Sequence, residues 1–291
     1  MKLIHIFSAL SLTLLAACSQ EEPPIPADYA ETDTLIATML QNVADAPDLE
    51  IVADIDHSRL AAAEGAAMAP ARVLIIGNPG LESMLVKKNR RLALDLPLRV
   101  LAYQGENGTH VTWNSFEYIK DRYKIEGTAG QRAGYNAQLD IVLDGIDPAY
   151  FKPFALDQMP SEGITHIDSP VDFAETKQRV LDAINGEEDA MIFGEVDFQA
   201  EAAELGIEIP PATLILFGAP APGAKVMSKS PTLGLDGFCQ KFLVWEGETG
   251  QVRLSYNDLQ VLGERHGGGA VIPLKVITAR MDKLFGEALA Q

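Results

Sequence analysis

The sequence repeats itself at a constant offset of 141 residues, and this repeat constrains the fold more than any other feature. Between 56–95 and 197–236, 12 of 40 positions are identical, where ordinary residue usage gives about three by chance. The identical pairs are Asp56/Asp197, Ala61/Ala202, Ala62/Ala203, Gly65/Gly206, Pro70/Pro211, Ala71/Ala212, Gly77/Gly218, Pro79/Pro220, Lys88/Lys229, Leu92/Leu233, Leu94/Leu235 and Asp95/Asp236. This period is far too long for a solenoid. The sequence therefore predicts a duplicated domain.

The two copies are expected at 32–146 and 169–291. The stretch between them, 147–168, contains Pro148, Pro153 and Pro160 and is interpreted as a linker. Sequence-based boundaries of this kind are good only to within several residues.

Each copy shows the same order of expected elements. A helix comes first, then a strand, a short Ala-rich helix, a continuous apolar strand, a two-stranded hairpin and a last helix. The expected ranges are 34–46, 49–56, 58–65, 72–76, 98–103, 109–113 and 135–143 in the first copy, and 172–185, 190–197, 213–217 and 274–289 in the second. This order favours an α+β fold of two similar domains, each a mostly antiparallel sheet with helices packed on one face.

The N-terminus has the features of a bacterial lipoprotein. Lys2 precedes an apolar run that is too short to span a bilayer, so 1–17 is predicted to be a signal peptide. Leu15-Ala16-Ala17-Cys18 resembles a lipobox, in which Cys18 is acylated; the alternative is an ordinary signal peptide with an incidental cysteine. The acidic, Pro-rich segment 18–31 is expected to be a tether. Ser19 favours the outer membrane by similarity to Gram-negative sorting rules, with the domains facing the periplasm.

The charge and the cysteines exclude several classes of function. A net charge of -18 argues against nucleic acid, which needs a basic surface, and against electrostatic adhesion to anionic lipid. If Cys18 is acylated, Cys239 is alone and no disulfide framework is possible. No His or Cys pattern has metal-ligand spacing, and no phosphate loop or nucleophile elbow is present. We therefore expect no metal, no cofactor and no catalytic set.

Two polar residues in the first copy are candidate binding residues. His57 follows a strand beside Asp56, which could orient the imidazole of a base or ligand; alternatively, Asp56 caps the following helix and His57 is a surface residue. Asn78 lies in the turn Gly77-Asn78-Pro79 between a buried strand and a helix, where ligands often bind. The alternative is a turn that needs only its Gly and Pro.

The basic run 87–91 and Asp95 complete the candidate set. Lys87 and Lys88 begin the one basic run of an acidic chain, which could hold an anionic ligand. The second copy keeps only Lys229 of it, and a solvated helix end is the simpler interpretation. Asp95 is an alternative partner for His57.

The pattern Ile55-Asp56-His57-Ser58, Ala61-Ala62, Pro70, 75–79 and 94–101 resembles the domain of unknown function 302 family. The resemblance covers nearly all of each copy. It implies a fold similar to the TATA-binding-protein class, and it implies no activity. The second copy has Phe198 in place of His57, Ala219 in place of Asn78, and Gly237-Phe238 opposite Leu96-Pro97.

These features favour a binding or envelope-associated module that is held to the membrane by N-terminal acyl chains. Its partner would be a small ligand or an envelope protein. One alternative is a hydrolase or isomerase that uses His57 with Asp56 or Asp95. Another is a structural protein that binds a partner over a broad surface formed by both copies.

Overall fold

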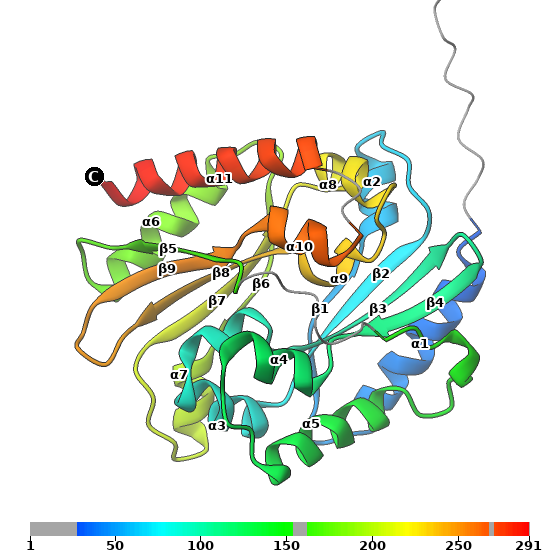
Figure 1. Cartoon of the computed structure of the whole chain (residues 1–291), viewed down its shortest axis with the longest axis horizontal. Helices are drawn as coiled ribbons and strands as arrows, with labels where there is room; N and C mark the ends of the chain where they lie inside the picture. Colours follow the sequence, from blue (N-terminus) through cyan, green and yellow to red (C-terminus); the bar gives the residue numbers. More distant parts are fainter. Residues whose placement is uncertain (1–27, 154–161, 268–270, 291) are drawn as a thin grey trace, which may run out of the picture.

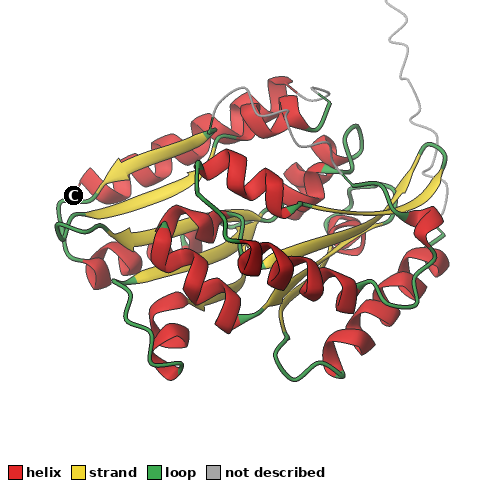
Figure 2. Cartoon of the chain, turned by 60° about the horizontal axis from the view of Figure 1, so that its bottom comes forward, coloured by secondary structure: helices red, strands yellow, loops and turns green. Residues whose placement is uncertain are grey.

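The computed structural model describes residues 28–153, 162–267 and 271–290. Two antiparallel sheets form its centre, with helices on either side (Figures 1 and 2). The first sheet has the order β1-β2-β3-β4 and the second β5-β9-β8-β7-β6. The α+β class and the two similar antiparallel sheets are confirmed. The predicted signal peptide and most of the predicted tether, with Cys18, lie outside the described residues.

The first copy contains four strands and six helical segments among the described residues. In chain order they are α1 (Ala30–Ala44), β1 (Glu50–Asp56), α2 (His57–Ala63), β2 (Ala71–Gly77), α3 (Pro79–Lys88), η1 (Arg90–Leu94), β3 (Leu98–Gly105), β4 (Gly108–Trp113), α4 (Phe116–Tyr123) and α5 (Ala129–Val142). A short 3-10 turn, η2 (Pro148–Tyr150), follows.

The second copy repeats this order behind one added strand. Its elements are β5 (Ile164–Asp168), α6 (Phe173–Asn185), β6 (Met191–Asp197), α7 (Phe198–Glu204), β7 (Ala212–Gly218), α8 (Pro220–Met227), α9 (Leu233–Asp236), β8 (Gln240–Glu246), β9 (Val252–Asn257), α10 (Leu259–Arg265) and α11 (Val271–Ala290).

The interpretation of 147–168 as linker is wrong at its C-terminal end. Residues 164–168 form β5, which pairs antiparallel with β9 along its whole length. The strand is five residues long and only partly buried, so it lacks the continuous apolar run that marked β2 and β7. Helices α4 (Phe116–Tyr123) and α10 (Leu259–Arg265) were also not predicted.

Local sequence explains the elements that were predicted. Asp56 and Asp197 accept hydrogen bonds from the backbone N–H groups of Arg59 and Ala200, so each caps the following helix. Gly65 adopts a φ of +76° just after α2, a conformation that glycine reaches without steric cost. β2 and β7 are buried along nearly their whole length, as their continuous apolar sequences predicted.

Each sheet is covered by its own helices on one face and by the other copy on the opposite face. Helices α1 and α5 pack together beside the first sheet, and α6 and α11 pack together beside the second (Figure 1). On the opposite faces, α9 of the second copy packs on β2 and β3, whereas η1 of the first copy packs on β7, β8 and β9. The two copies therefore share one core, in which Ile75 and Leu101 belong to the same apolar cluster as Leu214 and Leu243.

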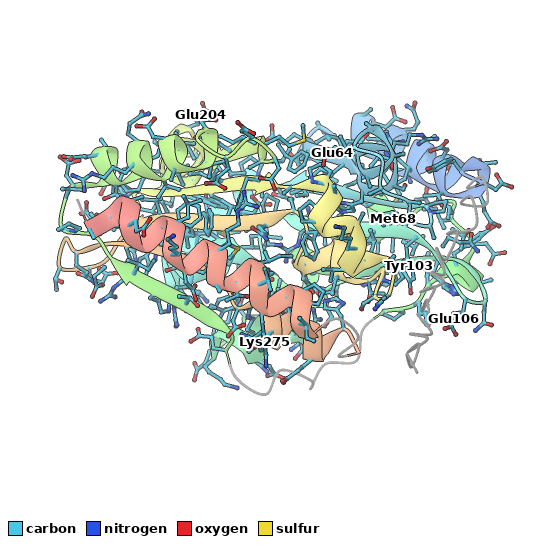
Figure 3. The ribbon with its side chains drawn as sticks, turned by 90° about the horizontal axis from the view of Figure 1, so that it is seen from above. Glu64, Met68, Tyr103, Glu106, Glu204 and Lys275 are labelled. Carbon is cyan, nitrogen blue, oxygen red and sulfur yellow. The ribbon has the colours of Figure 1, made fainter. Side chains whose placement is uncertain are left out.

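Paired helices extend this exchange to the surface. Helix α2 packs on α8, and α3 packs on α7. Glu64, labelled in Figure 3, follows α2 and accepts a hydrogen bond from the backbone N–H of Ala221 in α8, at 3.0 Å. A Cβ on Gly234 of α9 would lie 3.1 Å from the His57 ring and 3.3 Å from Leu101, so the copies pack tightly at this glycine. The two copies are therefore interlocked, and they do not form two separate domains joined by a linker.

Candidate functional site

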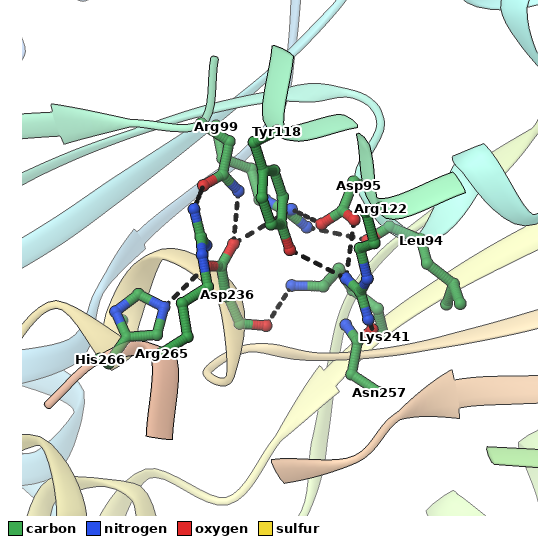
Figure 4. Close-up of polar contacts among 12 residues, drawn as sticks. Leu94, Asp95, Arg99, Tyr118, Arg122, Asp236, Lys241, Asn257, Arg265 and His266 are labelled. Atoms are coloured by element: carbon green, nitrogen blue, oxygen red, sulfur yellow. Dashed lines mark hydrogen bonds and ion pairs between the residues drawn. The ribbon is translucent and has the colours of Figure 1, made fainter. Parts of the chain in front are cut away.

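A cluster of buried polar side chains, here called the central cluster, lies between the two copies (Figure 4). Its members are Asp95, Arg99, Asn114, Tyr118, Arg122, Tyr123, Asp236, Lys241, Asn257, Arg265 and His266. All except Tyr118 form equivalent pairs between the copies. The register of β3 with β4 and of β8 with β9 makes Val100 equivalent to Phe242 and Trp113 to Tyr256. The same register pairs Arg99 with Lys241, Asn114 with Asn257, Arg122 with Arg265, and Tyr123 with His266.

Asp236 accepts hydrogen bonds from four cluster side chains. Its Oδ2 accepts from Arg265, and from Nε2 of His266 at 2.7 Å. Its Oδ1 accepts from Asn114 at 2.6 Å and from Arg99 at 3.3 Å. The carboxylate is almost completely buried, so these donors replace the water that it loses on folding.

Asp95 occupies the equivalent position in the first copy. It accepts from Arg99 at 2.6 Å, from Arg122 at 2.7 Å and from the Tyr123 hydroxyl at 2.9 Å. The Tyr123 contact corresponds to the His266 contact on Asp236. Each copy thus supplies one buried carboxylate, and donors from both copies hold the pair of carboxylates.

The cationic groups set the ionisation of both carboxylates. Burial alone would raise the pKa of Asp236, but the Arg265 guanidinium and the His266 hydrogen bond lower it well below its usual range. Burial likewise acts to raise the pKa of Asp95, and Arg122 and Arg99 lower it overall. Both residues are therefore ionised at neutral pH.

The two halves of the cluster differ at Lys241 and Asn257. The Lys241 ammonium donates to the backbone carbonyl of Asp236 at 2.5 Å, and that is its one hydrogen bond within the described part of the chain. Asn257 accepts from Arg122 through Oδ1 at 2.8 Å, but its Nδ2 has no acceptor among the described residues. The cluster thus carries hydrogen-bond donors that its own acceptors do not use.

His57 lies at the interface between the copies and outside the central cluster. It is buried, and Nε2 donates to the Gly234 carbonyl at 3.2 Å. Burial lowers the pKa of His57 to about 4, so the ring is neutral. Asp56 instead bonds Ser58 and Arg59. The expectation that Asp56 orients His57 is therefore wrong, because helix capping occupies that carboxylate.

The cavity beside His57 is too small for an organic substrate. It holds about 20 Å³ and is bordered by Cys239, Phe193 and Phe238, which leaves room for about one water molecule. The alternative of His57 as a surface residue is also wrong, since α9 covers the ring. His57 acts here as a packing residue between the copies.

Asn78 caps α3. Its Oδ1 accepts from the backbone N–H of Leu81 at 3.0 Å, and Pro79 begins the helix. The residue borders an open groove of about 760 Å³, which is lined by four aspartates. The side chain is thus committed to the helix, which supports the interpretation of this turn as structural.

The basic run 87–91 connects the copies. Arg90 pairs with Glu248 of the second copy at 2.8 Å, and Arg91 pairs with Glu162, in the connecting segment just before β5, at 2.5 Å. Lys88 donates to Gln131 at 3.0 Å, whereas Lys87 is exposed. Of the predicted candidates, the structure places only Asp95 in the central cluster.

Two equivalent pairs of the cluster could have been found by extending the repeat. At an offset of 143, Asn114 recurs as Asn257 and Arg122 recurs as Arg265. A comparison at the single offset of 141, which ends at Asp236, does not align these pairs. The structure also corrects one alignment between the copies. The strand registers make Leu98 equivalent to Gln240, so Leu96-Pro97 corresponds to Phe238-Cys239. Gly237 is therefore the residue added in the second copy.

A buried carboxyl group outside the central cluster lies where α3 meets α7. Glu82 is almost completely buried; its Oε1 accepts from the backbone N–H of Asn78 at 2.9 Å, and its Oε2 has no partner among the described residues. Burial raises the pKa of Glu82 to about 8 despite the Asn78 hydrogen bond. Burial also raises the pKa of the nearby Glu201, to about 7. Glu82 is therefore neutral in the fold at neutral pH.

We expect Glu82→Gln to remove a pH dependence of stability. A carboxyl with a raised folded pKa stabilises the fold fully below its unfolded pKa, and this contribution is lost as pH rises toward about 8. The variant should therefore gain on the order of 3–4 kcal/mol relative to the native chain between pH 5 and pH 8, since each pKa unit is worth about 1.4 kcal/mol. Urea unfolding at several pH values measures this. Glu204→Gln, at an exposed residue of α7 (Figure 3), is the control, and parallel curves for the native chain and Glu82→Gln would contradict the expectation.

Two further properties concern metals and membranes. Among the described residues, no group of three or more His, Cys, Asp or Glu side chains is arranged to hold a metal ion. Within the same residues, no helix combines the length and the apolar character needed to cross a bilayer.

Curated relatives match part of the chain. The fluoride-specific ion channel FluC 1 of Brucella suis biovar 1 is 38% identical over 108 residues, which are 37% of this chain and 41% of the relative. The fluoride-specific ion channel FluC 2 of Brucella melitensis biotype 1 is 38% identical over the same length and is covered to 39%. The match thus spans about two fifths of these relatives.

A solved structure and a family model complete the comparison. The crystal structure of an uncharacterized conserved protein DUF302 from Bacillus stearothermophilus is 18% identical, covers 44% of this chain and 96% of its own, and has a TM-score of 0.36. The family model for the domain of unknown function DUF302 matches residues 26–145 and 165–288. The chain therefore belongs to the DUF302 family and carries its domain in two tandem copies.

Proposed function

We propose that this protein is a lipid-anchored module of the bacterial outer membrane that faces the periplasm and binds a small anion in the central cluster. The proposal of an anionic ligand depends on one observation: the buried ammonium of Lys241 contacts no carboxylate among the described residues. A buried charge without a carboxylate in contact with it is costly. An anion that reaches Lys241 would remove this cost.

The balance of charge around Lys241 supports an anion. Arg99 bonds both carboxylates of the cluster, at 2.6 Å to Asp95 and 3.3 Å to Asp236. Arg122 takes the other oxygen of Asp95. No carboxylate oxygen of the described residues lies within ion-pair distance of the Lys241 ammonium. Cations therefore outnumber carboxylates on this side of the cluster.

The cluster also limits the size of the ligand. Lys241 is 2% exposed and Asn257 is 4% exposed, so the site is shielded from solvent. A halide or a similarly small oxyanion fits this setting better than an organic acid. Fluoride is the first anion to test, because curated relatives that share a segment with this chain are named as fluoride-specific channels. Channel activity itself is assigned to those proteins only.

Fluoride binding can be measured on the mature lipoprotein in detergent. We expect sodium fluoride to raise the melting temperature saturably, because a ligand that binds only the folded state stabilises it by mass action. Total sodium is held constant with gluconate, which is too large for the packed interior. Arg280→Ala removes an exposed ion pair with Glu187 and Asp189 and is the matched control. If neither fluoride, chloride nor formate differs from gluconate, the anion-binding proposal is wrong.

The lipid anchor has its own test. In a bacterium that processes lipoproteins, the native chain should incorporate labelled palmitate and fractionate with the outer membrane. Cys18→Ala should lose the label, because the thioether needs the cysteine sulfur, and the chain should leave the outer-membrane fraction. The anchor needs more than one acyl chain to be stable. A native chain that stays unlabelled and soluble in the periplasm would contradict the anchor and leave the anion site untouched.

A further inference from the structure

We infer that the anion binds on one side only of the pseudo-symmetric cluster, between the Lys241 ammonium and the Asn257 amide. The anion binds together with a proton on Lys241. This inference rests on the proposed function. The inference comes from two places where the equivalence of the copies fails.

The first failure is at the asparagines. Asn114 makes two bonds: its Oδ1 accepts from Arg265 at 2.8 Å, and its Nδ2 donates to Asp236 at 2.6 Å. Asn257 reproduces only the first, through Arg122. Its Nδ2, which would donate to Asp95 by symmetry, has no acceptor within the described chain. A buried amide N–H without an acceptor costs about 1–3 kcal/mol, so this position favours any acceptor that can reach it.

The second failure is at the strand cations. Arg99 spans both carboxylates and also donates to the Leu94 carbonyl at 3.0 Å. Lys241, its equivalent, makes one hydrogen bond, to the Asp236 carbonyl, and contacts no carboxylate among the described side chains. An ammonium has three donors. Lys241 therefore has donors to spare in the half where Asn257 also does.

The sheet places these two residues side by side. Phe242 of β8 pairs with Tyr256 of β9, and Lys241 and Asn257 are the next residues on the two strands. Cross-strand neighbours of this kind have Cβ atoms about 4.5–5.5 Å apart and project from the same face. Figure 4 shows both side chains beside the Arg122 guanidinium. A small anion between them would accept from an ammonium and from an amide N–H.

The groups around Lys241 make its protonation state sensitive to pH near neutrality and to a bound anion. Asp236 of α9, Asp95 after η1 and the Cys239 thiol favour the charged form, whereas Arg99 of β3 opposes it. The imidazoles of His57 and His266 also face Lys241, and burial lowers the pKa of both. Burial, reinforced by Arg99, lowers the pKa of Lys241 to about 7. An anion at Lys241 would raise this pKa, so binding takes up a proton when the pH is above 7.

Calorimetric titration of the mature lipoprotein with sodium fluoride tests the inference. For the native chain, the affinity should fall about tenfold per pH unit above pH 7, because one proton is taken up per anion. Titrations at pH 8 in two buffers of different ionisation enthalpy count that proton. Lys241→Arg, whose charge does not titrate in this range, should bind fluoride with little dependence on pH between 7 and 9.

Two variants test the position of the anion. Lys241→Met should weaken binding at least 30-fold, and Lys275→Met, at an exposed lysine of α11 (Figure 3), should leave it unchanged. Asn257→Asp is nearly isosteric and places a carboxylate beside Lys241, so it should abolish binding while retaining a folded chain by circular dichroism. If the native chain binds no anion, the proposed function fails. If the native chain binds but Lys241→Met and Asn257→Asp bind equally well, the proposed function survives and this inference is overturned.

Discussion

Residues 28–153, produced without the second copy, should be folded only as a dimer and should be largely unfolded at concentrations where they are monomeric. The reason is the exchange of elements between the copies. One face of the first sheet is covered by α9, and Ile75 and Leu101 share their core with Leu214 and Leu243 of the second copy. A monomeric first copy would expose that face to water.

The size of the loss follows from the buried residues at the interface. Removing a single buried leucine side chain from a core costs about 2–5 kcal/mol, and a typical domain has only about 5–15 kcal/mol of stability. Loss of Leu214, Leu216, Leu235 and Leu243 together, all fully buried in the shared core, therefore exceeds what one copy can supply. A homodimer would cover this face again, because the equivalent residues of a second molecule of residues 28–153 would occupy the positions of these leucines.

Sedimentation and circular dichroism across a concentration series measure this prediction. Secondary structure and dimer should appear together as the concentration rises, because folding and association are then one equilibrium. The full chain is the control, and it should fold independently of concentration. A folded monomer of residues 28–153 would contradict the shared core.

Much of this fold could be predicted from one sequence because the repeat doubles each signal. Asp56 and Asp197 both precede a short helix, and Gly65 and Gly206 both end one, with φ values of +76° and +69°. The buried strands β2 and β7 were expected from apolar runs that need no alternation. These are local features, and each recurs at the predicted place.

The central cluster could not be predicted in the same way, because no local rule brings its members together. Asp95 bonds Arg122, 27 residues away, and Asp236 bonds Asn114, 122 residues away. Arg99 and Lys241 lie within strands, where a charged residue ordinarily indicates a solvated face. Here the face is covered by the other copy, so the same pattern means a buried charge. The interlocking of the copies decides whether these charges are buried, and no sequence periodicity indicates that interlocking.

Asp236→Asn should destabilise the full chain by about 3–5 kcal/mol, the cost expected for removing one partner from a buried ion pair. The carboxylate accepts from Arg265, His266, Asn114 and Arg99. An amide presents one oxygen and one NH₂ group to these four donors. At least one donor then faces another donor in a setting without water, and the Arg265 charge loses its carboxylate.

The dependence on pH separates this ionic effect from a change in packing. The Arg265 guanidinium and the His266 hydrogen bond hold the folded pKa of Asp236 well below its usual range, so its contribution is present above the unfolded pKa and is lost as pH falls through the folded value. The difference between the native chain and Asp236→Asn should therefore stay constant from pH 7 down to about pH 4, the unfolded pKa of an aspartate, and shrink only below it. Urea unfolding between about pH 2 and pH 7 measures the difference. Asp189→Asn, in a largely exposed pair with Arg280, should cost less than about 1 kcal/mol. If Asp236→Asn costs no more than this control at pH 7, the central cluster does not hold the two copies together.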